Sequence, residues 1–423
     1  MLSKEVKKNK ILINLISMFK YLFKYLNFFF NKKISFKFSN PQKKEIVLFD
    51  GESHPHLKKL LSIYDYKIID NRPSRINEVY CSLNFIINFI INIFLLFRKN
   101  KNLQTTYFYT LIKIINPKVV ITSIDNSFKF SELAKLLAKK INFIAIQNAD
   151  RKDFSTNTHK FNIKLATENL NKKFYIPNYF CFGQYEEDNC KLYDIQVDKF
   201  YKFGSIRLAN FFEYIQINQI KLNKSKYDIC LISEPSPGLS EAYGIKTIEK
   251  GFSEIARYTI NFSRKHNLKF IFANKRPSSS DLFKKEIQFY KENLNDEDYS
   301  YLISNIPALD NKNQYSSYFA MFESKVVVAK QSTLLKEKIG CGEKILSCNL
   351  TNFSAWDFPI KGNCSINNCD YNEFEERLKK ILKLSNEEYF KNNSLHQSYI
   401  MNFDRNLNTI NKIRNKLDNF LDY

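Results

Sequence analysis

The sequence predicts an α/β protein made of two doubly wound domains with a cleft between them. Three observations lead to this fold class. The chain has 423 residues, which is enough for two or three domains that each bury a core. Short apolar runs that end in polar loops alternate with helical patterns along the chain, and such alternation is typical of parallel sheets. A polar stretch between Arg207 and Lys226 divides this pattern into two halves of similar size.

The first segment, residues 1–44, is basic and amphiphilic. Its apolar part, residues 11–30, is long enough to cross a bilayer but carries Lys20 and Lys24 on one helical face. This pattern favours a helix lying on the membrane surface over one that spans it. No small-residue cleavage site follows, which disfavours a signal peptide. We therefore expect a cytoplasmic protein that is peripheral on the inner face of the membrane.

The first domain is expected over residues 45–210. Its strands are expected within residues 45–51, 59–70, 117–127, 141–150, 179–183 and 200–205. Its helices are expected at 82–97 and 131–140, with a short one within 59–70 and another between 183 and 200, and an apolar segment is noted at 105–115. The apolar run Ser82–Phe97 is interpreted as a buried helix in preference to one that dips into a membrane.

A linker over residues 211–226 leads to the second domain, residues 227–390, and a charged helical tail follows at 391–423. Strands of the second domain are expected within residues 227–233, 268–277, 299–304, 324–333 and 343–349. Helices are expected at 247–265, 284–294 and 334–342.

Composition excludes several classes of function. None of the nine glycines has the spacing of a dinucleotide fingerprint or a Walker loop, and the eight cysteines and five histidines give no zinc-like spacing. The net charge of +22 suits an anionic membrane surface or phosphorylated ligands, although a generally basic solvated surface is an alternative. Nucleic acid is not an expected partner, because no module that recognises it is present.

Polar residues follow the expected strands of the first domain, where ligands of doubly wound sheets bind. Asp50 and Glu52 are candidates for a general base, with an ordinary turn and a helix cap as the alternative. The acceptor-side candidates after the next two strands are Asp125, Asn126, Gln147, Asn148 and Arg151. Each of these side chains is also a plausible loop cap.

The second domain repeats the arrangement. Its strand-end candidates for binding a donor nucleotide include Ser233, Glu234, Asn274, Lys275 and Arg276. Ser332 and Thr333 open a helix, whose free N–H groups suit a phosphate, and Glu337 one turn later suits a ribose diol. A plain helix cap with a solvated glutamate is the alternative interpretation.

The stretch SKVVVAKQSTLLKEKIGCGEKILSCN resembles the nucleotide-binding element of GT-B glycosyltransferases. NPKVVIT, IAIQNADR, CFGQYEEDNCKLYDI, FGSIRLANFF and SSYFAMFESKVVVAKQST resemble transferases of bacterial surface-carbohydrate and O-antigen biosynthesis, over residues 45–390. The resemblance implies a GT-B-like fold of two Rossmann-like domains, with Gln331, Ser332, Thr333 and Glu337 facing a nucleotide-sugar donor and Lys275 and Arg276 near its phosphates. The chain departs from the family at Ala149 and Leu335, where glycine is usual.

The resemblance implies a metal-independent transfer of sugar from a UDP-, GDP- or CMP-linked donor to a lipid-linked or growing surface glycan, without a cofactor. Asp50 or Glu52 would take the proton of the acceptor. Asp296-Glu297-Asp298 has the spacing of a metal-binding motif but is interpreted as a solvated turn. The alternatives are transfer of a polyol phosphate from a CDP-polyol, and a catalytically inactive scaffold of a glycan assembly complex. A sugar-nucleotide epimerase would have no use for the amphiphile.

Overall fold

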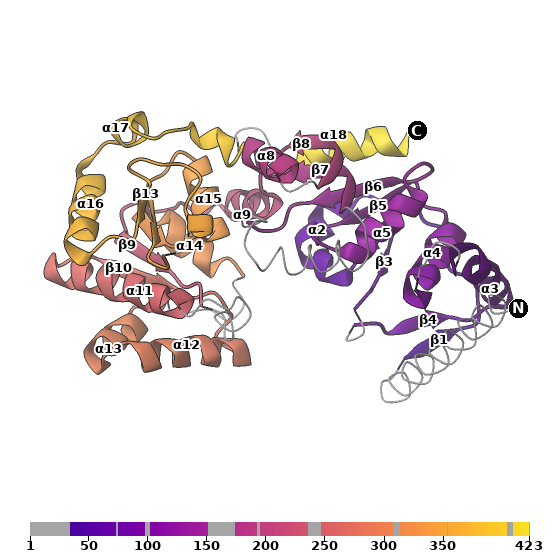
Figure 1. Ribbon diagram of the computed structural model, residues 1–423, viewed down its shortest axis with the longest axis horizontal. Coiled ribbons are helices and arrows are strands. Elements are labelled where there is room, and N and C mark those ends of the chain that lie inside the picture. Colours follow the sequence, from indigo (N-terminus) through magenta and orange to yellow (C-terminus); the bar gives the residue numbers. More distant parts are fainter. Residues whose placement is uncertain are drawn as a thin grey trace, which may run out of the picture.

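The computed structural model describes residues 34–72, 75–97, 102–150, 174–192, 195–235, 247–307, 314–352, 354–403 and 409–422. The apolar segment 11–30 and Arg151 lie outside the described residues. Two parallel sheets, each covered by helices, lie side by side along the longest axis of the molecule (Figure 1). The predicted GT-B-like architecture of two doubly wound halves is therefore confirmed. The exact domain boundaries stay a prediction.

Six parallel strands form the first sheet, in the order β3-β2-β5-β6-β7-β8. Their bounds are β2 Ile46–Phe49, β3 Tyr66–Ile69, β5 Val119–Thr122, β6 Asn142–Ile146, β7 Tyr175–Cys181 and β8 Gln196–Lys202. The central strands β2 and β5 are buried at every position because both faces of the sheet are covered. The strand order reverses between β2 and β5, so the loops after these two strands flank the switch point where doubly wound sheets bind ligands.

Two layers of helices bury the faces of the first sheet. On one face lie α4 (Leu103–Ile115) and α5 (Phe128–Leu137). On the other lie α2 (His54–Leu61), α9 (Ile206–Ile217) and, from the far end of the chain, α18 (Thr409–Leu421). A further helix, α8 (Gln184–Leu192), connects β7 to β8. The carboxyl-terminal helix is thus part of the core of the first half.

A small parallel pair, β1 (Ser35–Lys37) and β4 (Glu78–Tyr80), extends the first half at the end farthest from the second sheet (Figure 1). The helix α3 (Leu83–Phe97) follows β4 and packs against α4. Residues 82–97 were interpreted as a buried helix. The helix is present, but one of its faces is not buried, because seven large apolar residues of α3 are exposed. No helix in the described ranges has the length and apolar character needed to cross a bilayer.

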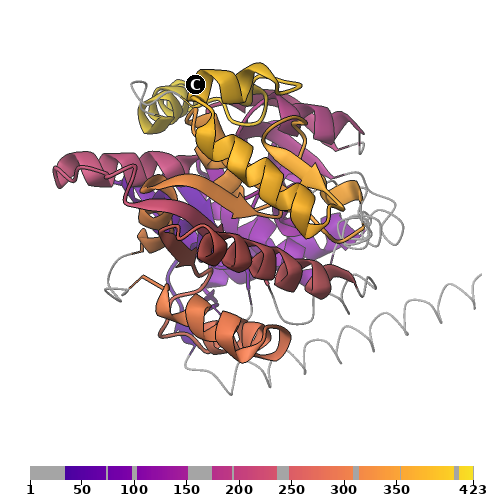
Figure 2. The same cartoon turned by 90° about the vertical axis from the view of Figure 1, so that its left-hand side faces the viewer.

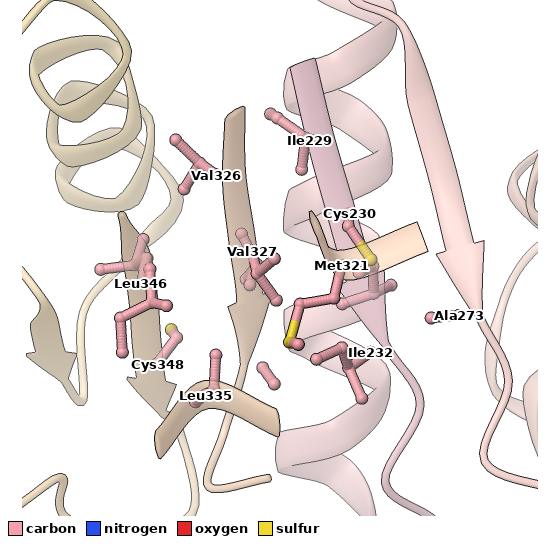
Figure 3. Close-up of a cluster of buried hydrophobic side chains, with 14 of the residues drawn as sticks. Ile229, Cys230, Ile232, Ala273, Met321, Val326, Val327, Leu335, Leu346 and Cys348 are labelled. Atoms are coloured by element: carbon pink, nitrogen blue, oxygen red, sulfur yellow. The ribbon is translucent and has the colours of Figure 1, made fainter. Parts of the chain in front are cut away.

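Five parallel strands form the second sheet, in the order β10-β9-β11-β12-β13. Their bounds are β9 Tyr227–Ile232, β10 Phe270–Ala273, β11 Ser324–Ala329, β12 Ile345–Asn349 and β13 Ser365–Asn367. Figure 3 shows side chains of neighbouring strands, such as Ile229 and Val326, gathered in one buried cluster with Leu335 of the helix that follows β11. Leu335 is fully buried, so this departure from the resembled family fills the core. The strand order reverses between β9 and β11.

The helices of the second half are α11 Thr247–Lys265, α12 Asp281–Asn293, α13 Asp296–Ser304, α14 Ser316–Phe322, α15 Thr333–Gly340, α16 Tyr371–Lys383 and α17 Asn386–Lys391. The long helix α11 contacts α16 as well as α12 and α13, and it lies between them (Figure 2). Short 3-10 turns occur at Gly51–Ser53, Ser354–Trp356 and Gln397–Tyr399.

Two sequence interpretations around residue 300 were wrong. Residues 299–304, expected as a strand, belong to α13, because Asn295 caps a helix through the N–H of Asp298. Asp296-Glu297-Asp298 is the first turn of that helix rather than a solvated turn. Asp298 is buried and accepts a hydrogen bond from Arg264, at 3.2 Å. Acidic side chains in this first turn also suit the helix dipole.

The chain passes between the halves twice. The expected linker 211–226 begins inside α9, where the fully buried Phe211 stacks on Phe322 of α14. The second passage, residues 397–403, crosses back towards α18 (Figure 1). It lies so close to Gly183 that a Cβ atom there would be 2.6 Å from the carbonyl oxygen of Tyr399. Only glycine leaves room for this backbone.

Candidate functional site

At the switch point of the second sheet, one carboxylate joins the loops that follow β9 and β11. Glu234, which follows β9, accepts hydrogen bonds from the backbone N–H groups of Lys330 and Gln331, which follow β11. The distances from Gln331 N to the two carboxylate oxygens are 3.0 and 3.1 Å. Ser233, also predicted here, is buried with its hydroxyl 3.3 Å from that of Tyr290. These contacts hold the loop that enters α15 in a fixed position.

The side chain of Gln331 is the unusual feature of this loop. It is 3% exposed, yet neither its Nε2 nor its Oε1 has a hydrogen-bond partner among the described residues. Leaving a buried amide unpaired costs about 1 to 3 kcal/mol, so such a group in a native fold needs an explanation. Ser332 comes next and caps α15 by accepting a hydrogen bond from Leu334 N at 3.3 Å. The unpaired amide therefore stands directly before the N-terminus of a helix, which attracts anions.

A buried cation lies beside this loop. Lys330 is fully buried, and its Nζ lies 3.0 Å from the centroid of the Trp356 ring and 4.8 Å from that of Phe252. Aromatic faces attract ammonium groups, so Trp356 and Phe252 stabilise the charge. The loop after β11 thus combines a positive charge, an unpaired amide and a helix N-terminus.

The loop after β10 contributes both structural and exposed side chains. Asn274 is buried, and its Nδ2 donates to the carbonyl oxygen of Arg276. Glu286 accepts from Lys275 N at 2.8 Å, and burial raises the pKa of Glu286. The side chains of Lys275 and Arg276 are exposed, and Lys275 Nζ donates to the Glu234 carbonyl at 3.2 Å. Asn274 therefore stabilises the conformation of the loop, while the side chains of the two cations are exposed on its surface.

The side of α15 that carries Lys336 is buried between the two halves. The hydroxyl of Thr333 accepts a hydrogen bond from Asp150 N at 2.8 Å. Lys336 is fully buried, contacts the Asp150 carboxylate and lies 3.4 Å from Glu186 Oε1. Burial alone would lower the pKa of Lys336, but the two carboxylates raise it. Burial also raises the pKa of Glu186 to about 7, although the charge of Lys336 acts to lower it.

Glu337 lies at the contact between the two halves. Its side chain is fully buried, and its Oε1 accepts hydrogen bonds from the hydroxyls of Ser205, at 2.5 Å, and Tyr318, at 3.1 Å. Burial raises its pKa, and the charge of Arg207 opposes that shift. Glu337 Oε1 thus joins the two halves, while Glu337 Oε2 has no hydrogen-bond partner among the described residues. The expected contact of Glu337 with a ribose stays a prediction.

The switch point of the first sheet carries a cluster of charges around Asp50. Asp50 is 2% exposed, has a positive φ of 76°, and accepts from Arg72 Nε at 3.1 Å and from Glu52 N at 3.1 Å. Arg72 also contacts the carboxylate of Glu52. Asp70 accepts from Gly51 N at 3.0 Å. Burial raises the pKa of Asp70, and the charge of Asp50 raises it further, against the hydrogen bond from Gly51.

Most of the other acceptor-side candidates make hydrogen bonds that stabilise the loops in which they lie. Asp125 is buried and accepts from the hydroxyl of Tyr179 at 2.7 Å. Gln147 is buried, donates to the carbonyl of Ala149 and accepts from Phe182 N. Asn126 is exposed, and Asn148 has a buried Oδ1 without a partner among the described residues. Among the described candidates, Asn148 thus has a buried oxygen that a ligand could pair, and Asn126 is open to solvent.

Comparison with known proteins gives one family match. A family model described as "putative O-antigen biosynthesis protein" matches residues 255–417. The match confirms the resemblance to proteins of surface-carbohydrate biosynthesis. None of the curated proteins matches the chain.

Solved structures similar to this chain include UDP-GlcNAc 2-epimerases and a polymerase. The epimerase from Methanocaldococcus jannaschii is 13% identical with a TM-score of 0.48, and the match covers 88% of this chain and 99% of that one. The epimerase from Neisseria meningitidis is 13% identical with a TM-score of 0.49 and the same coverage. The wall teichoic acid polymerase TagF is 10% identical with a TM-score of 0.48, and the match covers 90% of both chains.

Sequence reasoning missed two residues of the first-sheet site. Asp70 and Arg72 follow β3 just as Asp50 follows β2, so the same strand-end rule would have found them. Nearby in the sequence, His56 on α2 is partly buried, and burial together with the charge of Arg207 lowers its pKa to about 4. Its ring is therefore neutral near pH 7. Within the described residues, no group of three His, Cys, Asp or Glu side chains is arranged to hold a metal ion.

Proposed function

We propose that this protein is a glycosyltransferase of surface-glycan synthesis that binds a nucleotide-activated sugar at the switch point of its second sheet. The observation that carries the proposal is the buried amide of Gln331, whose two polar atoms have no partner among the described residues. A ligand with donors and acceptors, such as a nucleotide, would satisfy both atoms. The family match over residues 255–417, which includes this loop, supports a role in surface-carbohydrate synthesis.

The donor would lie across the loops after β9, β10 and β11. Its phosphates would meet the first turn of α15, where the helix N-terminus favours negative charge. The exposed cations Lys275 and Arg276 would neutralise the phosphate that leaves with the nucleotide. Thr333 and Glu337 Oε1 are bonded between the two halves, whereas Glu337 Oε2 is buried without a hydrogen-bond partner among the described residues.

The acceptor hydroxyl would approach from the first sheet. Its oxygen forms a bond to the anomeric carbon of the donor sugar while the bond from that carbon to the phosphate oxygen breaks. The hydroxyl proton passes to a carboxylate of the Asp50, Glu52 and Asp70 cluster. Arg72 contacts Asp50 and Glu52, whereas burial raises the pKa of Asp70, as suits a group that accepts a proton. Asp70 therefore joins the two predicted candidates for the base.

The test of donor binding is thermal unfolding of the full chain with UDP, GDP, CMP and CDP. A nucleotide at 100 times its dissociation constant stabilises by about 2.7 kcal/mol, which corresponds to a melting-temperature rise of roughly 5 °C. We expect one nucleotide to give such a rise, and Gln331→Leu to abolish it. The exposed Gln216 provides a matched control, because Gln216→Leu makes the same chemical change on α9. No response to any nucleotide would favour the inactive scaffold and refute the proposal.

The test of the base uses Asp70→Asn, Asp50→Asn and Glu52→Gln. Turnover is measured as release of the nucleotide in the presence of membranes that contain lipid-linked acceptors. We expect at least one variant to lose turnover by about 100-fold while it keeps the stabilisation by nucleotide. Full turnover in all three folded variants would show that the base lies elsewhere. Phosphate in the transferred group would instead identify a polyol phosphotransferase.

A further inference from the structure

The helix α3 has one buried face and one exposed apolar face. Phe85 and Leu96 are buried against the rest of the first half, and Asn92 donates to the hydroxyl of Thr110 on α4 at 3.0 Å. The opposite face is formed by large apolar residues between 42% and 75% exposed, namely Leu83, Ile86, Ile87, Ile90, Ile91, Phe94 and Leu95. Their spacing of three and four residues places them along one side of the helix. We call these seven residues the α3 face.

Two further exposed aromatic residues lie close to the start of this helix. Phe36 and Phe38 are 47% and 78% exposed on and just after β1. A hydrogen bond from Ser82 Oγ to Asn40 Oδ1, at 2.6 Å, joins the segment after β1 to the beginning of α3. Figure 1 shows β1 and α3 together at the end of the molecule farthest from the second sheet. The apolar surface therefore lies well away from the proposed donor site.

An apolar surface of this extent needs a partner. Single exposed apolar residues are common on soluble proteins, but a contiguous patch marks an interaction site. Within α3 itself no residue is charged, so nothing on the helix opposes contact with an apolar phase or with anionic headgroups. By sequence, the basic residues Arg98, Lys99 and Lys101 follow the helix. Apolar side chains flanked by cations complement a membrane that contains anionic lipids.

We propose that the α3 face binds the surface of a bilayer containing anionic lipids, with α3 lying in the plane of the interface. The place where residues 1–33 join the fold supports this choice. Their apolar stretch 11–30 ends a few residues before β1, and its Lys20 and Lys24 give it the pattern of a surface-bound helix. The predicted amphiphile thus precedes β1, which lies beside the start of α3. This inference does not depend on the proposed function.

The experiment is flotation of the full chain with vesicles of phosphatidylcholine alone or with phosphatidylglycerol. The test variant replaces Ile87, Ile91 and Phe94 of the α3 face with glutamate. The control variant makes the same three changes at Leu192, Ile217 and Leu282, which are isolated and equally exposed, at 47% to 71%. We expect wild type and control to float with the anionic vesicles. The test variant should bind at least about tenfold more weakly, because each exposed side chain contributes apolar area to the contact. Equal binding of test and control variants would overturn the proposal.

A fluorescence measurement separates the membrane from other occupants of the α3 face. Trp356 is the only native tryptophan and is fully buried, so its emission provides a constant background. We expect Phe94→Trp to emit as a water-exposed indole without lipid, and to shift to the blue and be quenched when brominated anionic lipid is added. A blue emission without lipid, together with no quenching by brominated lipid, would show that residues 1–33 or a second copy of the chain covers the face, and would refute the inference.

Discussion

The buried cation Lys336 allows a quantitative test of how the two halves are held together. In Lys336→Met the carboxylates of Asp150 and Glu186 lose the cation between them, although the new side chain fills a similar volume. Removing one partner of a buried ion pair costs about 3 to 5 kcal/mol, because the remaining charge is uncompensated. For a cooperative unit of one half of this chain, that loss lowers the melting temperature by roughly 10 °C.

The destabilisation should depend on pH in a definite direction. A carboxyl whose folded pKa is raised stabilises the fold most below its unfolded pKa, and this contribution is lost as the pH rises through the folded value. Glu186 already has a pKa raised to about 7, and loss of Lys336 raises it further. Calorimetry should therefore show a small loss at pH 5 and the full loss at pH 8.

A neutral triple variant tests whether uncompensated charge is the cause. Lys336→Met, Asp150→Asn and Glu186→Gln together remove every charge of the network. Neutral replacement of buried ion pairs is often without cost, so the triple variant should recover most of the stability at pH 8. If the triple variant is as unstable as the single variant, the loss reflects packing and the electrostatic reasoning is refuted.

Three further predictions concern single positions. Gln331→Leu should keep or raise the melting temperature without nucleotide, because it removes an unpaired buried amide, and a fall of several degrees would show that the amide is satisfied within the fold. Gly183→Ala should destabilise by about 1 to 3 kcal/mol and expose residues 397–403 to limited proteolysis, since its Cβ would meet the backbone of Tyr399; unchanged cleavage would contradict the close contact. In the wild type, the shift of Glu186 from 4.5 to about 7 should lower stability by about 3 kcal/mol as the pH rises across that window, and Glu186→Gln should remove this slope in urea titrations.

The regular part of the fold was predictable because local signals agreed with it. The apolar run of β11, the cap at Ser332 and the second run of β12 gave the strand, helix and strand of the second switch point. Residues 299–304 were wrongly predicted as a strand because tyrosine and isoleucine favour strands. The cap at Asn295 and the acidic first turn instead determine a helix.

The candidate site was only partly predictable, because sequence does not reveal what each helical face meets. The strand-end rule correctly located the loops of Asp50, Glu234 and Gln331 at the two switch points. It did not reveal that Glu337 is bonded to Ser205 from the first half, a contact between residues 132 positions apart. Nor did apolar composition reveal that α3 is buried on one side alone, since both sides consist of the same residue types.

The position of α18 has a consequence for the order in which the protein folds during synthesis. Ile410, Ile413 and Leu417 are buried in the core of the first half with strands β2 and β5, which the ribosome makes more than 280 residues earlier. That core cannot close until α18 has emerged, whereas all strands of the second sheet are made before residue 368. Amino-terminal units usually fold first, but here the second half can complete its fold before the first half can. Deleting α18 would leave the first half with an open apolar face.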